Sequence, residues 1–270
     1  MMEALAVRQH HEVLARLARV TDPELDEPVT TLGFITDVAV EEGRVAIHFR
    51  LPTYWCAANF AFLMAEDMRR EVAALDWVRR VDVTLNDHMY ADTINSGIQR
   101  GATFHEAFGN DAAADLDELR LTFNRKSFQR RQELLLRALL DAGRAPEMLV
   151  GLTVAGLHEA CGDEVLRGLA ARYLDRRDIP GAFDGGSLAF VDVQGRPLSA
   201  ADAMRPYLRS LRNVAVNVEF NGALCRGLLA ARFNEAQPED REPTLHDFML
   251  QALSRQTGEG QGHAQDTAAR

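Results

Sequence analysis

Hydrophobic and polar residues follow two different periods over residues 1–92. Apolar residues lie three or four positions apart in Ala4–Ala18, and again from about Ala57 to Leu75, which predicts two amphipathic helices. Phe34–Val40, Val45–Leu51 and Val78–Leu85 alternate with period two, which predicts three strands, the first two joined by a tight turn. The order helix, strand, strand, helix, strand predicts an α+β fold whose first domain has two layers and a small mixed sheet.

The pattern changes after residue 92. Residues 93–114 hold three glycines and little apolar periodicity, which indicates a linker, although Thr103 and Glu106 have the spacing of a capping box for one short helix. Residues 115–253 read as a mainly helical domain that begins with a long helix ended by Gly143. Within it, Leu188–Val193 predicts a strand, and Val214–Val218 predicts a strand or a buried connector. Residues 254–270 are polar and predicted to be disordered.

Composition narrows the function. The formal net charge of -10 gives no electrostatic reason to bind nucleic acid or an anionic membrane. The first eighteen residues are too polar for a signal peptide, and no run approaches the ~18 apolar residues of a membrane span, so we expect a cytoplasmic protein. The three cysteines are far apart and odd in number, so they do not form a disulfide framework.

Cys56 has the most informative position among these cysteines. It stands at the start of a predicted helix, where unpaired backbone N–H groups and the helix dipole favour a negative charge and hence a thiolate. Thr53 can cap this helix or donate to the sulfur. Asp22 and Glu24 lie in a turn that this topology allows to approach the same edge of the sheet. The alternatives are that Cys56 packs the helix start and that the two carboxylates form the turn.

The same residues carry a resemblance to a known family. Asp22-Pro23-Glu24, then Leu32-Gly33-Phe34-Ile35, then Thr53-Tyr54-Trp55-Cys56 occur in order and in matching elements over about a third of the chain. They resemble the metal–sulfur cluster assembly factor domain, also called the PaaD-like or SufT-like domain. The chain departs from that family at Ala57, which is usually proline, and at Tyr54-Trp55, which is usually Pro-Gly.

The resemblance implies a role in iron–sulfur cluster assembly, with Cys56 as a ligand of a transient iron–sulfur cluster or of iron. One cysteine cannot hold a cluster alone, so the site would be transient, shared between the two chains of a homodimer, or completed by other ligands. We therefore expect an accessory or maturation factor, not an enzyme, that delivers a cluster or metal to a client metalloprotein. Domains similar to this one serve multicomponent oxygenases, which makes an oxygenase the expected client.

Two other functions stay open at this point. In the first, the domain is a scaffold, Cys56 is structural, and the protein is a metal-independent folding chaperone or complex subunit. In the second, Cys56 is the nucleophile of a thiol enzyme with His48 or His88 as its general base.

The helical half offers weaker candidates. His158 and Cys161 lie at i, i+3 on a helix, where two metal ligands could stand, but packing is the favoured interpretation for Cys161 and for Cys225. A basic cluster on the long helix is either a solvated face or a surface that recognises the client, and it consists of Arg125, Lys126, Arg130 and Arg131.

Overall fold

The computed structural model describes residues 2–109, 116–198 and 203–233. The amino-terminal domain has the predicted order of elements: α1 (Met2–Leu17), β1 (Ile35–Glu41), β2 (Arg44–Phe49), α2 (Ala58–Ala73) and β3 (Arg80–Leu85). A mainly helical half follows, so the predicted α+β fold is confirmed. The predicted tail and the end of the predicted helical domain, residues 234–270, lie outside the described residues.

The sheet is mixed and has the order β1-β2-β3. The hairpin between β1 and β2 turns on Glu42 and Gly43, whose φ angles of 46° and 84° are both positive, as a type I′ turn requires. Strands β2 and β3 run parallel and end together at Phe49 and Leu85. Strand β1 starts opposite Phe49. The start of β1, the end of β2 and the end of β3 therefore share one edge of the sheet.

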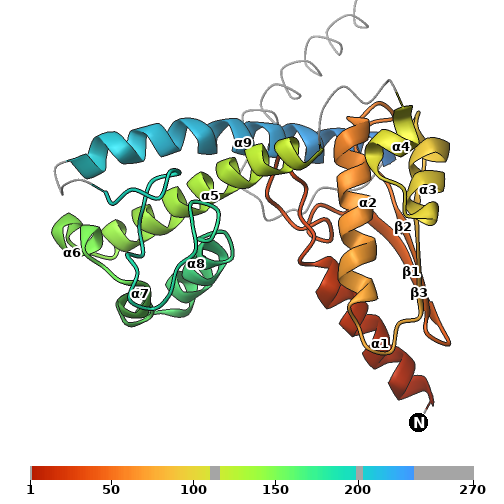
Figure 1. Cartoon of the computed structure of the whole chain (residues 1–270), viewed down its shortest axis with the longest axis horizontal. Helices are drawn as coiled ribbons and strands as arrows, with labels where there is room; N and C mark the ends of the chain where they lie inside the picture. The colour runs from red at the N-terminus through yellow and green to blue at the C-terminus, as the bar shows by residue number, and fades with distance from the viewer. Residues whose placement is uncertain (1, 110–115, 199–202, 234–270) are drawn as a thin grey trace, which may run out of the picture.

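Helices α1 and α2 cover one face of the sheet, as Figure 1 shows. Alternation places Val45, Ile47 and Phe49 of β2 on this face, where all three are fully buried. Met68 and Val72 of α2 are buried in the same core. This core fixes the axis of α2, and so it fixes the position of the loop that joins β2 to α2.

The segment predicted as a linker differs in the structure. Residues 93–100 lie in α3 (Ala91–Arg100), residues 104–108 form α4 (Phe104–Phe108), and residues 110–114 lie outside the described residues. Ile94, Ile98 and Phe104 are part of the amino-terminal core. A Cβ on Gly97 would stand 2.9 Å from the Ala107 Cβ, so this glycine permits close helix packing and does not mark a flexible segment. The capping box at Thr103 is confirmed, since its side chain accepts from the Glu106 N–H.

Two long antiparallel helices, α5 (Leu116–Asp141) and α9 (Met204–Phe233), lie side by side and form the frame of the second half (Figure 1). Gly143 ends α5 at φ 81°, and the Arg144 N–H donates to the Leu139 carbonyl, as in a Schellman motif. The described residues of this half form three shorter helices as well: α6 (Pro146–Val150), α7 (Val154–Ala160) and α8 (Glu164–Leu174). No helix within the described ranges is both long and apolar enough to cross a membrane.

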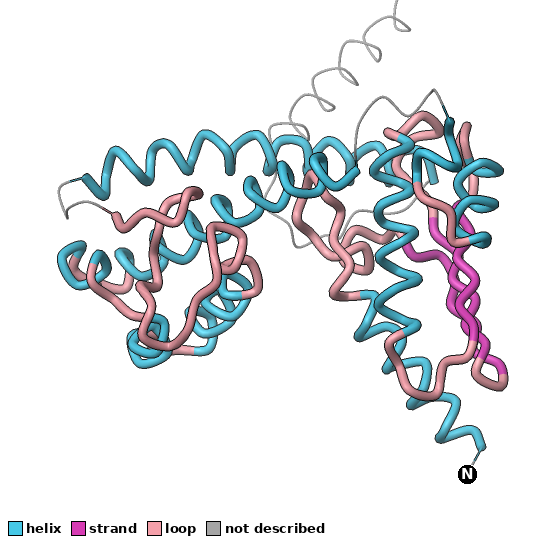
Figure 2. Tube along the Cα trace, in the orientation of Figure 1, coloured by secondary structure: helices cyan, strands magenta, loops and turns pink. Residues whose placement is uncertain are grey.

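Two predictions in this half were wrong, the strand at Leu188–Val193 and the strand or buried connector at Val214–Val218. Leu188–Val193 is a loop with isolated bridges, drawn among the pink segments of Figure 2, and its carbonyl groups accept hydrogen bonds from the side chains of Tyr173 and Arg177 instead of joining a sheet. Val214–Val218 lies inside α9. Its β-branched residues favour a strand locally, but Ala215 and Val218 are buried at helical spacing, and this tertiary packing overrides the local preference.

The second half of α9 reaches back to the amino-terminal domain, where it passes behind α2 in Figure 1. Leu229 belongs to the amino-terminal core, and its Cδ2 lies 3.6 Å from where a Cβ on Gly33 would stand. Arg232 donates to the backbone carbonyl of Leu51 at 3.3 Å. Helix α9 therefore packs against the sheet edge that carries the Cys56 loop.

Candidate functional site

Cys56 lies in the tight loop between β2 and α2. Its Sγ is 3.1 Å from the Thr53 Oγ1, and its N–H donates to the Thr53 carbonyl at 3.4 Å. Helix α2 begins at Ala58 with Ala57 as its N-cap, so the thiol stands just before the first turn. Of the two roles predicted for Thr53, the structure places its hydroxyl against the sulfur and gives the N-cap no side-chain hydrogen bond.

The Asp22–Glu27 turn faces the same edge. The Asp22 carboxylate accepts hydrogen bonds from the backbone N–H groups of Glu24 and Leu25, at 2.9 and 2.8 Å. Burial raises the pKa of Asp22 to about 6. Asp22 is therefore a buried side chain that stabilises the turn. The Glu24 carboxylate instead points at α9 and accepts a hydrogen bond from the Asn221 side chain at 3.0 Å.

Helix α9 adds a second thiol. Cys225 lies one turn after Asn221, and both Cys225 and Cys56 pack, half-buried, against the amino-terminal core. Burial raises the pKa of Cys225 to about 12, and the nearby groups Asp22, Cys56 and Glu24 add to this effect. The structure thus brings Asp22, Glu24 and Cys56 within electrostatic range of a cysteine for which we predicted only packing.

These four side chains do not form a closed metal site. In the part of the chain that the structure describes, no three His, Cys, Asp or Glu side chains are arranged to hold a metal ion. Two of the four are thiols close enough for Cys56 to contribute to the raised pKa of Cys225, and thiolates are the usual ligands of iron–sulfur clusters. An arrangement with two thiols supplies part of a ligand set and leaves the rest to another molecule.

His88 binds the backbone of the Cys56 loop. Its Nε2 lies 2.8 Å from the Cys56 carbonyl oxygen, and its Nδ1 lies 3.1 Å from the Tyr90 N–H. A carbonyl only accepts and an amide N–H only donates, so Nε2 carries the proton and Nδ1 accepts. Burial lowers the pKa of His88, which keeps it neutral. Both ring nitrogens are engaged, and neither is available to take a proton from the Cys56 thiol.

A comparison with known families decides the relationship. The sequence profile of the family described as iron–sulfur cluster assembly protein matches residues 10–84. An uncharacterized protein of Methanocaldococcus jannaschii is 32% identical over 85 residues, which are 31% of this chain and 87% of that protein. Through these residues the chain belongs to the iron–sulfur cluster assembly protein family.

Two plant proteins match about a third of the chain. The chloroplastic Fe–S cluster assembly factor HCF101 of Oryza sativa subsp. japonica is 29% identical over 93 residues, which are 33% of this chain and 18% of that protein. The corresponding protein of Arabidopsis thaliana is 29% identical over 84 residues, which are 31% of this chain and 16% of that protein. The chain spans less than a fifth of the length of these two relatives, and the helical half is matched by none of the three.

One departure from the family pattern keeps a backbone conformation that proline could also adopt. Ala57 stands where the family usually has proline, and its φ of -58° lies in the range that a proline ring imposes. At the second departure, the Trp55 side chain is 71% exposed and Tyr54 is 48% exposed. These bulky residues therefore lie on the outside of the loop and leave room for the Thr53–Cys56 contact.

Side chains of the helical half also bind the Asp22–Glu27 turn. Arg131 of α5 forms a bidentate ion pair with Asp26, with both distances at or below 2.7 Å, and both side chains are buried. Burial alone would raise the pKa of Asp26, but hydrogen bonds and charge from Arg131 hold it below its usual value. Arg130 donates to the Leu25 carbonyl at 3.0 Å, and Arg226 donates to Glu27 at 2.8 Å.

Two of the four residues in the predicted basic cluster are therefore used within the chain. Arg130 and Arg131 hold the Asp22–Glu27 turn, while Arg125 and Lys126 are exposed. Sequence reasoning missed this pairing because Asp26 and Arg131 lie 105 positions apart.

The weaker metal candidates remain apart from the site. His158 is exposed and Cys161 is buried, and burial raises the pKa of the Cys161 thiol. Cys161 belongs to the core of the helical half, as expected for a packing residue. His48 lies within β2, opposite Asp37 of β1, and not in the Cys56 loop.

Proposed function

We propose that this protein is a non-catalytic accessory factor that assembles or delivers an iron–sulfur cluster to a client protein. The observation that carries the proposal is the pair of thiols, Cys56 from the family's loop and Cys225 from α9, at one edge of the sheet. Membership in the iron–sulfur cluster assembly protein family supports it. The cluster is cargo in this account, and Cys56 is its first ligand.

The chemistry favours delivery over storage. Each thiol must lose its proton to bind iron, and the raised pKa of Cys225 makes this loss costly near neutral pH. The full ligand set of a cluster is usually made of cysteines, and this chain contributes two. The remaining iron positions are open to cysteines of the client, which displace Cys56 and Cys225 by ligand exchange while these two thiols take up protons again.

Partner and location are part of the same proposal. The iron positions that Cys56 and Cys225 leave open are filled by the client or by the second chain of a homodimer, and the exposed residues Tyr54 and Trp55 beside Cys56 offer a contact for a client metalloprotein. We keep a multicomponent oxygenase of the cytoplasm as the proposed client. The engagement of both nitrogens of His88 supports a non-catalytic role for Cys56.

A transfer experiment tests this function. The protein is loaded with iron and sulfide without oxygen and mixed with an apo-ferredoxin as a model client, and holo-ferredoxin is followed by its visible absorption. We expect the wild type to transfer the cluster. Cys56→Ser should give no holo-ferredoxin beyond the background rate measured with free iron and sulfide. Equal transfer by both proteins would contradict the proposal and favour the metal-independent chaperone.

A further inference from the structure

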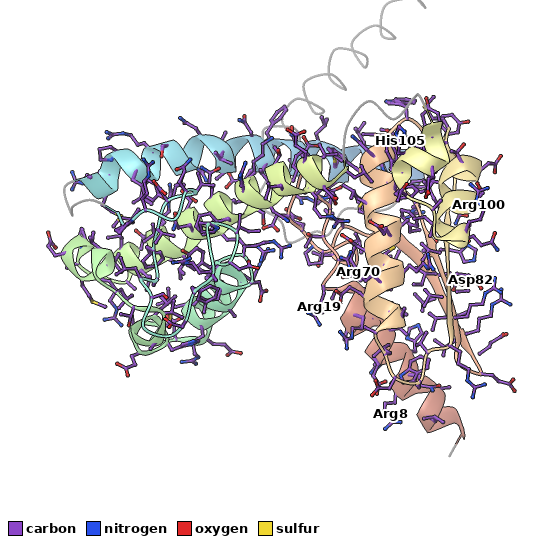
Figure 3. All side chains as sticks on the ribbon, in the orientation of Figure 1. Arg8, Arg19, Arg70, Asp82, Arg100 and His105 are labelled. Carbon is purple, nitrogen blue, oxygen red and sulfur yellow. The ribbon has the colours of Figure 1, made fainter. Side chains whose placement is uncertain are left out.

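A cavity of about 620 Å³ opens between the two halves of the molecule. Its walls are the residues that follow α1, the Asp22–Glu27 turn, α2, α5 and the end of α8, and neither Cys56 nor Cys225 lines it. Figure 3 labels two of its arginines, Arg19 and Arg70, on the side of the amino-terminal domain that faces α8. The cavity is therefore a separate feature, on the other side of the turn from the thiols.

Positive charge exceeds negative charge in this cavity, although the chain as a whole is acidic. Six arginines and four carboxylates line it. Asp67 pairs with Arg120 and Arg70, each at 2.7 Å, and Asp26 pairs with Arg131. Glu71 lies 3.6 Å from Arg19. The fourth carboxylate, Asp175, is 71% exposed and lies 3.9 Å from Arg131.

Two guanidinium groups are left after these pairings. Within the described residues, Arg172 and Arg176 have no carboxylate at ion-pair distance, and Arg172 donates only to the Asp26 carbonyl, at 3.3 Å. The Nε of Arg176 is buried and has no hydrogen-bond partner there. Burial, followed by the charge of Arg131, lowers the pKa of Arg176. A desolvated cation beside like charges is unfavourable, and an anion in the cavity would relieve it.

We propose that this cavity binds a small molecule that carries phosphate or carboxylate oxyanions, with Arg172 and Arg176 as its charge partners. A guanidinium presents parallel N–H donors that match either kind of oxyanion in bidentate fashion. Asn124 of α5 lines the same cavity and can add a neutral amide donor. The volume accommodates a ligand larger than a single phosphate ion.

The location gives the ligand a structural consequence. Pro23 and Asp26 line the cavity, whereas Asp22 and Glu24 of the same turn lie near Cys225. A ligand held by α8 and the turn would tie the helical half to the amino-terminal domain. This inference does not depend on the cluster-handling role, since it concerns other side chains and another kind of ligand.

The test is binding to the full chain, measured by isothermal titration calorimetry with pyrophosphate, inorganic phosphate and citrate at constant ionic strength. We expect saturable binding of at least one of these anions. Arg176→Gln and Arg172→Gln should each weaken this binding by about tenfold or more, because each removes a charge-assisted bidentate contact. Binding of the phosphates alone or of citrate alone would identify the kind of oxyanion.

The matched control is Arg125→Gln, which removes an exposed arginine of α5 that does not line the cavity. It should bind like the wild type. Circular dichroism checks that each variant is folded, and the two cavity variants allow for the failure of one. No saturable binding by the wild type, or equal affinity in the wild type and the folded Arg176→Gln and Arg172→Gln variants, would overturn the proposal.

Discussion

The substitution Asp22→Asn should remove a pH-dependent loss of unfolding free energy that the buried Asp22 carboxylate causes. The Asp22 Oδ1 accepts both hydrogen bonds of the turn, and the amide oxygen of asparagine can accept the same two. Asparagine does not ionise. The variant therefore keeps the turn and loses only the burial of a carboxylate charge.

The magnitude follows from the pKa of Asp22, which rises from 3.8 to about 6 on folding. Below both values the carboxyl is protonated in the folded and unfolded chains, and it costs nothing. As pH rises through this window the unfolded chain releases its proton first, so the free energy of unfolding falls. Above pH 6 the cost approaches about 3 kcal/mol, at about 1.4 kcal/mol per pKa unit.

The assay is urea unfolding of the wild type and Asp22→Asn at a series of pH values from about 4 to about 7.5. We expect the free energy of unfolding of the variant to rise relative to that of the wild type by up to about 3 kcal/mol as the pH increases across this range. Other groups, including His88, titrate in both proteins and cancel in the difference. The amide N–H groups of asparagine add an offset that does not change with pH. A difference in stability that is constant with pH would refute the reasoning.

Two further predictions concern the packing that holds the site in place. Arg131→Met leaves the Asp26 carboxylate buried and unpaired, so we expect a loss of about 3–5 kcal/mol of unfolding free energy, measured by urea unfolding, against about 0.5 kcal/mol for the exposed Arg125→Gln; a loss no larger than the control would contradict the importance of the pair. Gly97→Ala places a Cβ 2.9 Å from Ala107 and 3.1 Å from Phe62. It should lower the melting temperature, at a cost of about 1–3 kcal/mol, and an unchanged melting temperature would mean that α3 is not closely packed.

The amino-terminal domain was predictable because its signals are local. Alternation in β1, β2 and β3 and the turn at Glu42-Gly43 need no partner from elsewhere in the chain. The motif that ends at Cys56 is also contiguous, so its position at the head of α2 could be predicted. The linker prediction relied on glycines, and local sequence does not distinguish a glycine in a flexible turn from Gly97, which makes room for a neighbouring helix.

The second thiol was not predictable, because it depends on where α9 lies. Cys225 sits in an apolar stretch, which is typical of a packing residue. Its approach to Asp22 and Cys56 arises from contacts that join residues far apart in sequence, such as Asn221 with Glu24 and Arg232 with Leu51. Single-sequence patterns contain no information on such pairs. The one available signal was the concentration of polar residues, Asn221 and Arg226, on either side of Cys225.

The central claim is that Cys56 and Cys225 hold the iron–sulfur cargo, and the direct measurement is iron and acid-labile sulfide per chain after reconstitution without oxygen. Four proteins are compared: the wild type, Cys56→Ser, Cys225→Ser and the control Cys161→Ser, whose sulfur is buried in the other core. A serine hydroxyl does not replace a thiolate ligand at neutral pH. The account predicts loading of the wild type and Cys161→Ser, no loading of Cys56→Ser, and weak, easily lost loading of Cys225→Ser. Full loading of Cys225→Ser would remove α9 from the site, and full loading of Cys56→Ser would contradict the account as a whole.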